Sequence, residues 1–288
     1  MKPVYTSISS LLGSSITVIE RDEPYFASGF HAHPEFELVY IKEGFGKRII
    51  GNNINEFKEG ELVLIGPNVP HVWMSHESFK EDSAKRSKAI VVYFNPKIFS
   101  DLFYEMEETR QLKALFEQAE YGIDIKETAK QQSVLKLNKM ITAKGLNKIV
   151  LLLDVLNHIS VTAGIECINK QIVMKQPHPS DRLAHVFDYI NSNFKKNIAL
   201  KDVAKIINLT PESFCRFFRQ KTGKKFIDYL NETRISYATR SLLSTDLTIA
   251  EIAYNTGFKT ASNFNKLFKK INGYSPTAYR QAAVSNVV

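Results

Sequence analysis

The sequence predicts an α+β protein with more than one domain: an N-terminal β-barrel, a helical region after it, and an all-α C-terminal domain. Three observations lead to this fold class. Short segments rich in β-branched and aromatic residues fill the first 95 residues, helical periodicity begins near Pro96, and a helical motif occurs twice in the last third of the chain. A length of 288 residues suits two or three domains, since a domain usually holds roughly 100–200 residues.

Residues 1–95 are predicted to form the barrel. Its strands are the segments FELVYI, KRIIG, ELVLIG and KAIVVYF, which glycine, proline and asparagine separate from one another. Closely spaced strands of this kind are typical of an antiparallel sandwich or barrel.

Residues 96–175 are predicted to be helical. The segment from Leu146 to Ile159 is apolar on nearly every side, and such a helix must be covered on every side. Two interpretations stay open: one of its faces meets a second subunit, or the whole helix lies inside the core. The first makes this region the dimerisation and coupling region of a homodimer. Pro177 and Pro179 then interrupt the helical pattern, so residues 176–181 are the predicted linker to a domain over residues 182–288.

The composition is that of an ordinary globular protein. Hydrophobic residues make up 44% and charged residues 24%, which excludes a disordered or fibrous chain. The two cysteines, Cys167 and Cys215, have neither metal-binding nor disulfide spacing, which indicates a reducing compartment. No apolar run approaches the ~20 residues that span a bilayer, and no signal peptide is recognisable. We expect a cytoplasmic protein without a membrane partner.

The positive charge is concentrated at the C-terminal end. Residues 181–288 hold 17 Lys and Arg against 8 Asp and Glu, a net charge of +9, whereas residues 1–180 have a net charge of −1. A basic segment of this kind indicates nucleic acid as a partner, and a solvated basic face is the alternative.

The same basic segment contains an internal repeat. Phe214, Phe218 and Gly223 recur 50 residues later as Phe264, Phe268 and Gly273. Each copy predicts a short helix, a turn and a second helix, with Asn208 in the first turn and Gly257 in the second as residues suited to the left-handed conformation. Thr210 is the predicted N-cap and Pro211 the first residue of the second helix in the first copy. This is a helix-turn-helix pattern, present twice.

The second helix of each copy is predicted to leave a polar and cationic face uncovered, as a recognition helix in a major groove requires. The candidate DNA contacts are Glu212, Ser213, Arg216, Arg219 and Gln220 in the first copy, and Thr260, Ser262, Asn263, Asn265, Lys266 and Lys269 in the second. A long helix over residues 226–243 joins the copies. If it holds the two recognition helices about one turn of DNA apart (~34 Å), one chain reads two successive major-groove segments.

The repeat resembles a known family. Residues 249–280, IAEIAYNTGFKTASNFNKLFKKINGYSPTAYR, resemble the signature region of AraC/XylS-family transcription regulators, and RISYATRSLL at 234–243 resembles their connecting helix. The resemblance covers residues 181–281 and implies two helix-turn-helix subdomains that bind double-stranded promoter DNA. Thr260 stands where many members have an acidic residue, and Asn263 where an aromatic one is common. These departures concern base preference and not the fold.

The most chemical motif of the first half is HAHPEFE. His31, His33 and Glu37 share parity, so on an extended strand they point to one side. With GELVLIGPNVPH, which ends at His71, they resemble the two motifs of the cupin barrel, including the positions that hold metal in cupin enzymes. The second motif departs from the cupin pattern, because Gly66 and Asn68 break the usual Pro-x-Gly.

Three interpretations of the cluster of His31, His33, Glu37 and His71 stay open. Three imidazoles and a carboxylate suit a divalent metal. In AraC-type regulators with a cupin sensor, similar residues line a metal-free effector pocket, and buried histidines can also be purely structural. Trp73 shares the parity of His71, so its ring is expected to face inward and to meet a sugar or another small metabolite.

The resemblance therefore implies a ligand-responsive transcription regulator and not an enzyme. The cupin-like domain would sense a small-molecule effector, the helical region would pair subunits, and the C-terminal domain would bind promoter DNA, with RNA polymerase as a further partner. The rival interpretation is a cupin metalloenzyme, an isomerase or dioxygenase, with a helical appendage. The repeat argues against that rival, because an enzyme has no use for two recognition helices.

Overall fold

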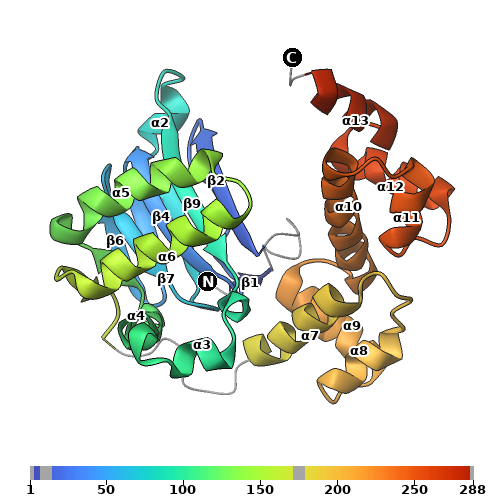
Figure 1. The fold of residues 1–288 in the computed structure, drawn as a ribbon, viewed down its shortest axis with the longest axis horizontal. Coiled ribbons are helices and arrows are strands. Elements are labelled where there is room, and N and C mark those ends of the chain that lie inside the picture. The colour runs from blue at the N-terminus through green and yellow to red at the C-terminus, as the bar shows by residue number, and fades with distance from the viewer. Residues whose placement is uncertain (1–2, 7–14, 171–178, 286–288) are drawn as a thin grey trace. The chain divides into compact units, whose positions relative to one another are not determined.

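A computed structural model describes residues 3–6, 15–170 and 179–285, and its contacts divide the chain into two compact units. Among the described residues, 3–6 and 15–170 belong to the N-terminal unit and 179–285 to the C-terminal unit (Figure 1). No described helix has the length and apolarity needed to cross a bilayer.

The N-terminal unit contains two β-sheets. One has the strand order β1 (Val4–Tyr5), β3 (His31–Ala32), β8 (His71–Ser75), β5 (Gly46–Ile50) and β6 (Asn53–Phe57). The other has the order β11 (Ile165–Cys167), β10 (Ile123–Ile125), β7 (Leu62–Ile65), β4 (Phe36–Glu43), β9 (Ser87–Phe94) and β2 (Ile16–Glu23). All the pairings are antiparallel except that of β1 with β3. The four strands expected from the sequence are confirmed as β4, β5, β7 and β9.

The six-stranded sheet has an apolar core on each face. Along β4, Val39 and Ile41 face the five-stranded sheet and pack with Trp73, whereas Leu38 faces the opposite way. Helices α4 (Arg110–Ala119), α5 (Glu127–Thr142) and α6 (Leu146–Val161) cover that opposite face, as Figure 1 shows. The unit is therefore built in three layers: sheet, sheet and helices.

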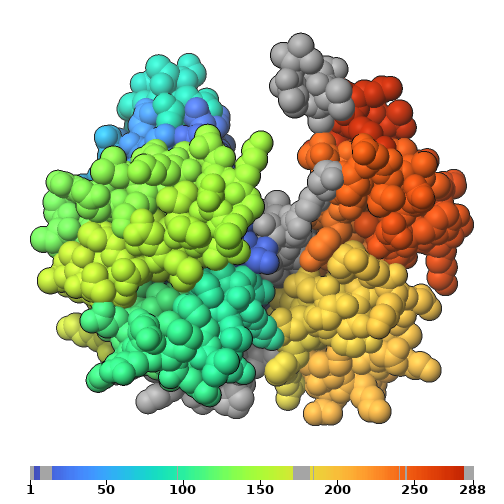
Figure 2. Space-filling view, in the orientation of Figure 1, coloured from blue at the N-terminus to red at the C-terminus, as the bar shows by residue number. Residues whose placement is uncertain are grey.

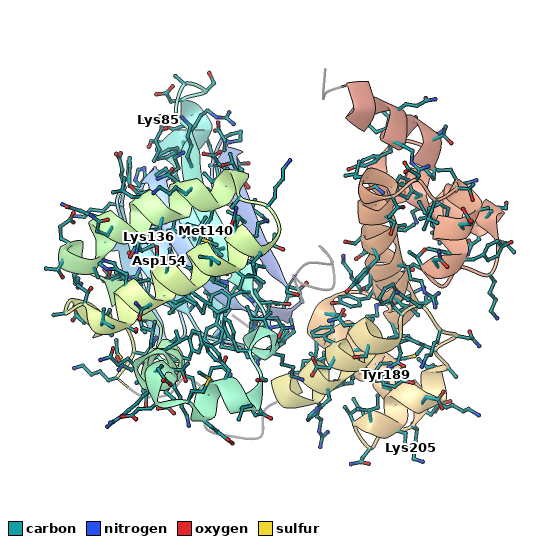
Figure 3. The ribbon with its side chains drawn as sticks, in the orientation of Figure 1. Lys85, Lys136, Met140, Asp154, Tyr189 and Lys205 are labelled. Atoms are coloured by element: carbon teal, nitrogen blue, oxygen red, sulfur yellow. The ribbon has the colours of Figure 1, made fainter. Side chains whose placement is uncertain are left out.

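Helices α5 and α6 lie side by side across the outer face. Asp154 accepts a hydrogen bond of 2.6 Å from Nζ of Lys136, and Met140 is buried beneath the pair (Figure 3). The side chains of both helices cover the middle of the face of this unit that is turned to the viewer in Figure 2, and the teal-green segment of residues 100–120 lies below them. Smaller elements complete the unit: α2 (Ser78–Glu81), η1 (Pro96–Ile98), α3 (Asp101–Glu105) and η2 (Glu107–Thr109).

Two expectations about the middle of the chain need correction. The region 96–175 is not purely helical, because β10 and β11 add to the edge of the sheet through β7. Three-residue strands carry too little periodicity to stand out in a sequence. The predicted linker 176–181 overlaps the start of α7 (Pro179–Asn193), since Pro179 occupies a helix start, where proline is tolerated. Residues 176–178 lie outside the described residues.

The C-terminal unit is all-helical. After α7 come α8 (Leu200–Ile206), α9 (Pro211–Thr222), α10 (Phe226–Ser244), α11 (Ile249–Asn255), α12 (Ala261–Asn272) and α13 (Pro276–Ser285). The expected connecting helix is confirmed as α10, and its predicted apolar side is buried at Tyr229, Leu230, Ile235, Ala238 and Leu242. Helices α7 to α9 lie towards the N-terminal end of α10 and α11 to α13 towards its C-terminal end (Figure 1).

Candidate functional site

The structure brings the four polar residues of the first half together between the two sheets. His31 and His71 are register partners of the antiparallel strands β3 and β8. Glu37 lies on β4, in the other sheet, and His33 lies just after β3. One ligand atom of each residue lies within 4.8 Å of the others. Shared parity predicted that His31, His33 and Glu37 lie on one side of a single strand. Instead, the chain passes from one sheet to the other between His33 and Glu37, so the four side chains converge from opposite sheets.

The three imidazoles of the cluster are held in the same way. Each Nδ1 lies within hydrogen-bonding distance of a backbone carbonyl oxygen two residues away, to which it can donate. The distances are 2.8 Å from His31 to Gly29, 3.1 Å from His33 to Glu35 and 2.8 Å from His71 to Val69. Such a bond to the outer ring nitrogen is the usual way in which metal-ligating histidines are oriented, because it leaves the lone pair of Nε2 free.

The Nε2 atoms of two of these histidines meet one carboxylate oxygen. Oε2 of Glu37 lies 2.9 Å from Nε2 of His33 and 2.7 Å from Nε2 of His71. The contact with His71 lacks hydrogen-bond geometry, so its Nε2 is buried without a hydrogen-bond partner among the described residues. An unprotonated Nε2 facing a carboxylate places two acceptors in contact, which a proton or a cation between them would relieve.

The electrostatics of the cluster follow from burial and these short contacts. Burial by itself would raise the pKa of Glu37, but electrostatic attraction from the close His71 ring and the hydrogen bond with His33 hold it well below its ordinary value. Burial by itself would lower the pKa of His33, but the hydrogen bond and charge of Glu37, together with Glu35, raise it above its ordinary value. Burial and the neighbouring charge of His71 lower the pKa of His31 to about 4.

A cavity of about 270 Å³ opens beside the cluster. His31 and Glu37 of the cluster line it, and Trp73 and Tyr93 contribute aromatic rings. Trp73 is 7% exposed, and it faces inward as its parity predicted. The remaining lining residues are Arg21, Glu23, Tyr25, Phe26, Ala27, Ser28, Val39, Ile41, Ala89 and Val91. A larger groove of about 1060 Å³ is lined by Arg48 and Glu61 and by none of the candidate site residues expected from the sequence.

A buried ion pair that sequence reasoning missed lies behind Trp73. Nε of Arg48 donates to Oε1 of Glu61 at 2.8 Å, and the Trp73 indole nitrogen lies 3.5 Å from Oε2 of the same carboxylate. Burial raises the pKa of Glu61. The one available signal was that Arg48 shares the parity of Ile50, an unusual place for a charge on an inward-facing strand. Tyr93 and Arg21, which also line the cavity, were missed because nothing in the sequence separates them from other strand residues.

The two predicted helix-turn-helix units are confirmed. In the first, α8 and α9 are joined through Asn208 at φ 55°, and Thr210 caps α9 by accepting a hydrogen bond from the backbone of Ser213. In the second, Gly257 has φ 87° between α11 and α12. Thr248 and Glu251 form a capping box at the start of α11.

The candidate DNA contacts lie on one uncovered face of α9 and one of α12. The inner faces are buried through Phe214 and Phe218 in α9 and through Phe264 and Phe268 in α12. Ser213 is half-buried, whereas the other ten candidates are exposed: Glu212, Arg216, Arg219, Gln220, Thr260, Ser262, Asn263, Asn265, Lys266 and Lys269. Helices α9 and α12 therefore expose amide, hydroxyl and cationic groups to solvent in the folded chain.

Comparison with sequence families gives two matches. Residues 13–185 match the family described as AraC-like ligand binding domain, and residues 203–282 match a helix-turn-helix domain. The first match alone covers more than half of the chain.

Individual relatives match mainly in one part of the chain. An uncharacterised HTH-type transcriptional regulator from Staphylococcus aureus (strain COL) is 32% identical over 100 residues, which is 35% of this chain and 13% of the relative. The lactose operon transcription activator of Staphylococcus xylosus is 32% identical over 101 residues, 35% of this chain and 36% of the relative. Both matches span well under two thirds of the relatives. Among solved structures, ToxT from Vibrio cholerae is 15% identical with a TM-score of 0.46, over 93% of this chain and 98% of that one.

Proposed function

The chain belongs to the AraC family of helix-turn-helix transcription regulators, with an AraC-like ligand-binding domain, and on that premise we propose that a small molecule in the Trp73 cavity controls its promoter binding. Family membership makes the chain a DNA-binding regulator and not a metalloenzyme. The observation that carries the proposal is the cavity of about 270 Å³ in the ligand-binding unit, next to a cluster of four convergent polar side chains.

The effector is a sugar or another small metabolite with several polar atoms. The Trp73 indole offers an apolar ring face, and His31 and Glu37 offer polar groups in the same cavity. Tyr93 and Arg21 also line this cavity and supply hydrogen-bond donors. An apolar wall facing a few fixed polar groups is the usual design of a small-molecule site.

The polar cluster also fits a divalent metal ion, which we propose as part of the effector site. His31, His33 and His71 would each offer Nε2, and Glu37 an oxygen. Two observations support this: the three rings are anchored to backbone carbonyls, and the buried Nε2 of His71 has no hydrogen-bond partner in the described part of the chain. A bound ion would supply a Lewis-acidic centre for an effector oxygen. Metal analysis of the purified protein should find one Zn²⁺, Mn²⁺, Fe²⁺ or Ni²⁺ per chain in the wild type and none in His33→Ala. Absence of metal from the wild type after growth in metal-supplemented medium would leave a metal-free effector pocket.

On the DNA side, α9 and α12 are proposed to read successive major-groove segments. We propose that Arg216 contacts a guanine edge and Lys266 a phosphate, because guanidinium groups pair bidentately with bases and ammonium groups act as point charges. RNA polymerase is the further partner expected at the promoter.

An exposed apolar strip on helix α6 is consistent with our proposal that the chain forms a homodimer. Its inner side is buried in the unit, yet Leu146 is 71% exposed and Val150 54% exposed on the outer side, with Ile149 exposed beside them. Such an apolar strip on a helix suits a second copy of the same surface. Val150→Asp should shift the protein to monomers in sedimentation, and Lys144→Asp, a charge change just before the helix, should not. An unchanged dimer in Val150→Asp would place the subunit contact elsewhere.

Selection of genomic fragments by the full chain tests the central proposal. The salt concentration should be near-physiological, because a basic domain binds any DNA at low salt. We expect enrichment of a few sites, each with two motifs in neighbouring groove segments, and a change in occupancy when cell extract supplies effector. Trp73→Ala should keep the sites and lose the response to extract. Enrichment that ignores extract in the wild type would contradict effector control.

A further inference from the structure

A buried arginine of the connecting helix joins the two helix-turn-helix units directly. Arg234 lies on α10 and is 9% exposed. Its Nε donates to the carbonyl oxygen of Phe194 at 2.9 Å, and its Nη2 donates to that of Lys196 at 2.9 Å. Both carbonyls belong to the segment between α7 and α8, so the guanidinium binds the backbone that leads into the first helix-turn-helix unit.

The turn of the second helix-turn-helix unit, at Gly257, packs against the same Phe194 carbonyl and the Arg234 side chain. Gly257 has φ 87°, and a Cβ atom there would lie 2.4 Å from the Phe194 carbonyl oxygen and 3.0 Å from Nε of Arg234. Next to this glycine, the ring of Phe258 has its centroid 5.8 Å from the Arg234 guanidinium carbon. The backbone of the second turn therefore approaches the first unit as closely as only glycine allows.

These contacts of Arg234 connect the two helix-turn-helix units in addition to the covalent connection through α10. A ring stack between Phe194 and Tyr237, with centroids 4.0 Å apart and planes inclined by 23°, holds the same segment against α10. A single helix leaves its two ends free to bend and twist gently relative to each other. A planar guanidinium with two fixed acceptors resists this motion, because its fork accepts only one arrangement of the carbonyls.

We propose that Arg234, with Gly257 beside it, is the positioning residue that fixes the separation and rotation of α9 and α12. It thereby sets the distance between the two DNA motifs that one chain recognises. Arg234 is buried among protein groups and makes no DNA contact itself. The inference rests on the proposal that both helices read DNA.

A parallel selection from a synthetic duplex library with a random core, using the full chain, tests the inference. The variant is Arg234→Met, which keeps the length of the side chain and removes its donors. The matched control is Arg280→Met. Nε of Arg280 donates to the Leu242 carbonyl at 3.1 Å and its Nη2 to the Leu247 carbonyl at 2.7 Å, so it ties α13 to the end of α10 inside the second unit alone.

We expect the wild type and Arg280→Met to select two motifs at one separation, about 10 base pairs. Arg234→Met should select the same two motifs over several separations. Its affinity for the two-motif duplex at the wild-type separation should fall about tenfold, since loosened units lose effective concentration, whereas its affinity for a duplex with one motif should stay unchanged. That split distinguishes positioning from a general loss of stability, which would weaken binding to both duplexes.

Arg234→Lys provides a second test if the methionine variant unfolds. Lysine keeps the charge without the guanidinium fork, so it should broaden the selected separations to a smaller extent. Selection of a single separation by a folded Arg234→Met or Arg234→Lys would overturn the inference. Failure of the wild type to enrich paired motifs would instead overturn the proposal that both helices read DNA, and the inference with it.

Discussion

The rings of His71 and Trp73 lie 5.8 Å apart between centroids, with their planes inclined by 65°. Trp73 is the only tryptophan of the chain, so its fluorescence reports on this place alone. Imidazole ligands suit Ni²⁺, and bound Ni²⁺ quenches a neighbouring indole. We expect a saturable loss of fluorescence that ends at one Ni²⁺ per chain. His33→Ala should abolish it and His76→Ala, a change of an exposed histidine, should not; equal quenching in both variants would contradict metal binding by the cluster.

The buried pair of Arg48 and Glu61 should be important for the stability of the ligand-binding unit. Their side chains are 4% and 11% exposed, so Glu61→Ala leaves the guanidinium charge buried without its carboxylate. Loss of one partner of such a pair typically costs about 3–5 kcal/mol of unfolding free energy. Denaturant unfolding followed by Trp73 fluorescence measures this unit selectively. The double variant Arg48→Met with Glu61→Leu should recover much of the loss, whereas additive losses would mean that the two side chains act independently.

Substitutions of Arg216 on α9 and Lys266 on α12 should have different effects on DNA binding, because the first is proposed to contact a base and the second a phosphate. Arg216→Ala should lower discrimination at one base pair of the selected site by about 1–3 kcal/mol. Lys266→Ala should weaken binding to all sequences alike and reduce the slope of log affinity against log salt by about 1. Lys113→Ala, in the ligand-binding unit, is the control for a lost surface charge. An unchanged sequence preference in Arg216→Ala would remove that residue from the base contacts.

The metal-free protein should lose stability in mild acid because of His31. Its pKa in the folded protein is about 4, below the ordinary 6.5, so folding disfavours the protonated ring. The stabilisation is fully present above about pH 6.5 and falls as the pH drops through about 4. The slope approaches about 1.4 kcal/mol per pH unit. The lowered pKa of Glu37 affects stability only below its ordinary value near 4.5, whereas the raised pKa values of His33 and Glu61 favour the folded state as the pH falls in the interval above that value. The contribution of His31 is therefore the difference between the wild type and a variant at position 31.

Unfolding followed by Trp73 fluorescence between pH 6.5 and pH 4.5 measures this dependence. His31→Gln should flatten the curve, because glutamine does not titrate, and His76→Gln should leave it as in the wild type. An equally steep curve in His31→Gln would assign the acid sensitivity to another group.

Much of the fold could be predicted because its signals are local. Strands β4, β5, β7 and β9 alternate or concentrate apolar residues over several positions, and both helix-turn-helix units have caps and left-handed turn residues within a few positions of each other. Strands β10 and β11 were missed because three residues carry no recognisable period. The polar cluster was predicted through the wrong geometry, since His31 and Glu37 belong to different sheets.

The sequence by itself determined what local periodicity, turn chemistry and a long motif can carry: the two recognition helices, the barrel strands, and the identity of the four clustered side chains. Only the tertiary structure decided which distant groups meet. Arg48 meets Glu61, which lies just before β7 of the other sheet, Arg234 donates to carbonyl groups some 40 positions before it, and Gly257 packs against the Phe194 carbonyl. Such pairs depend on how whole sheets and helices pack, and the residues themselves carry no mark of their partners. The types and spacing of the functional side chains can be recognised from short stretches of sequence, whereas the contacts between distant residues arise from the packing of whole elements.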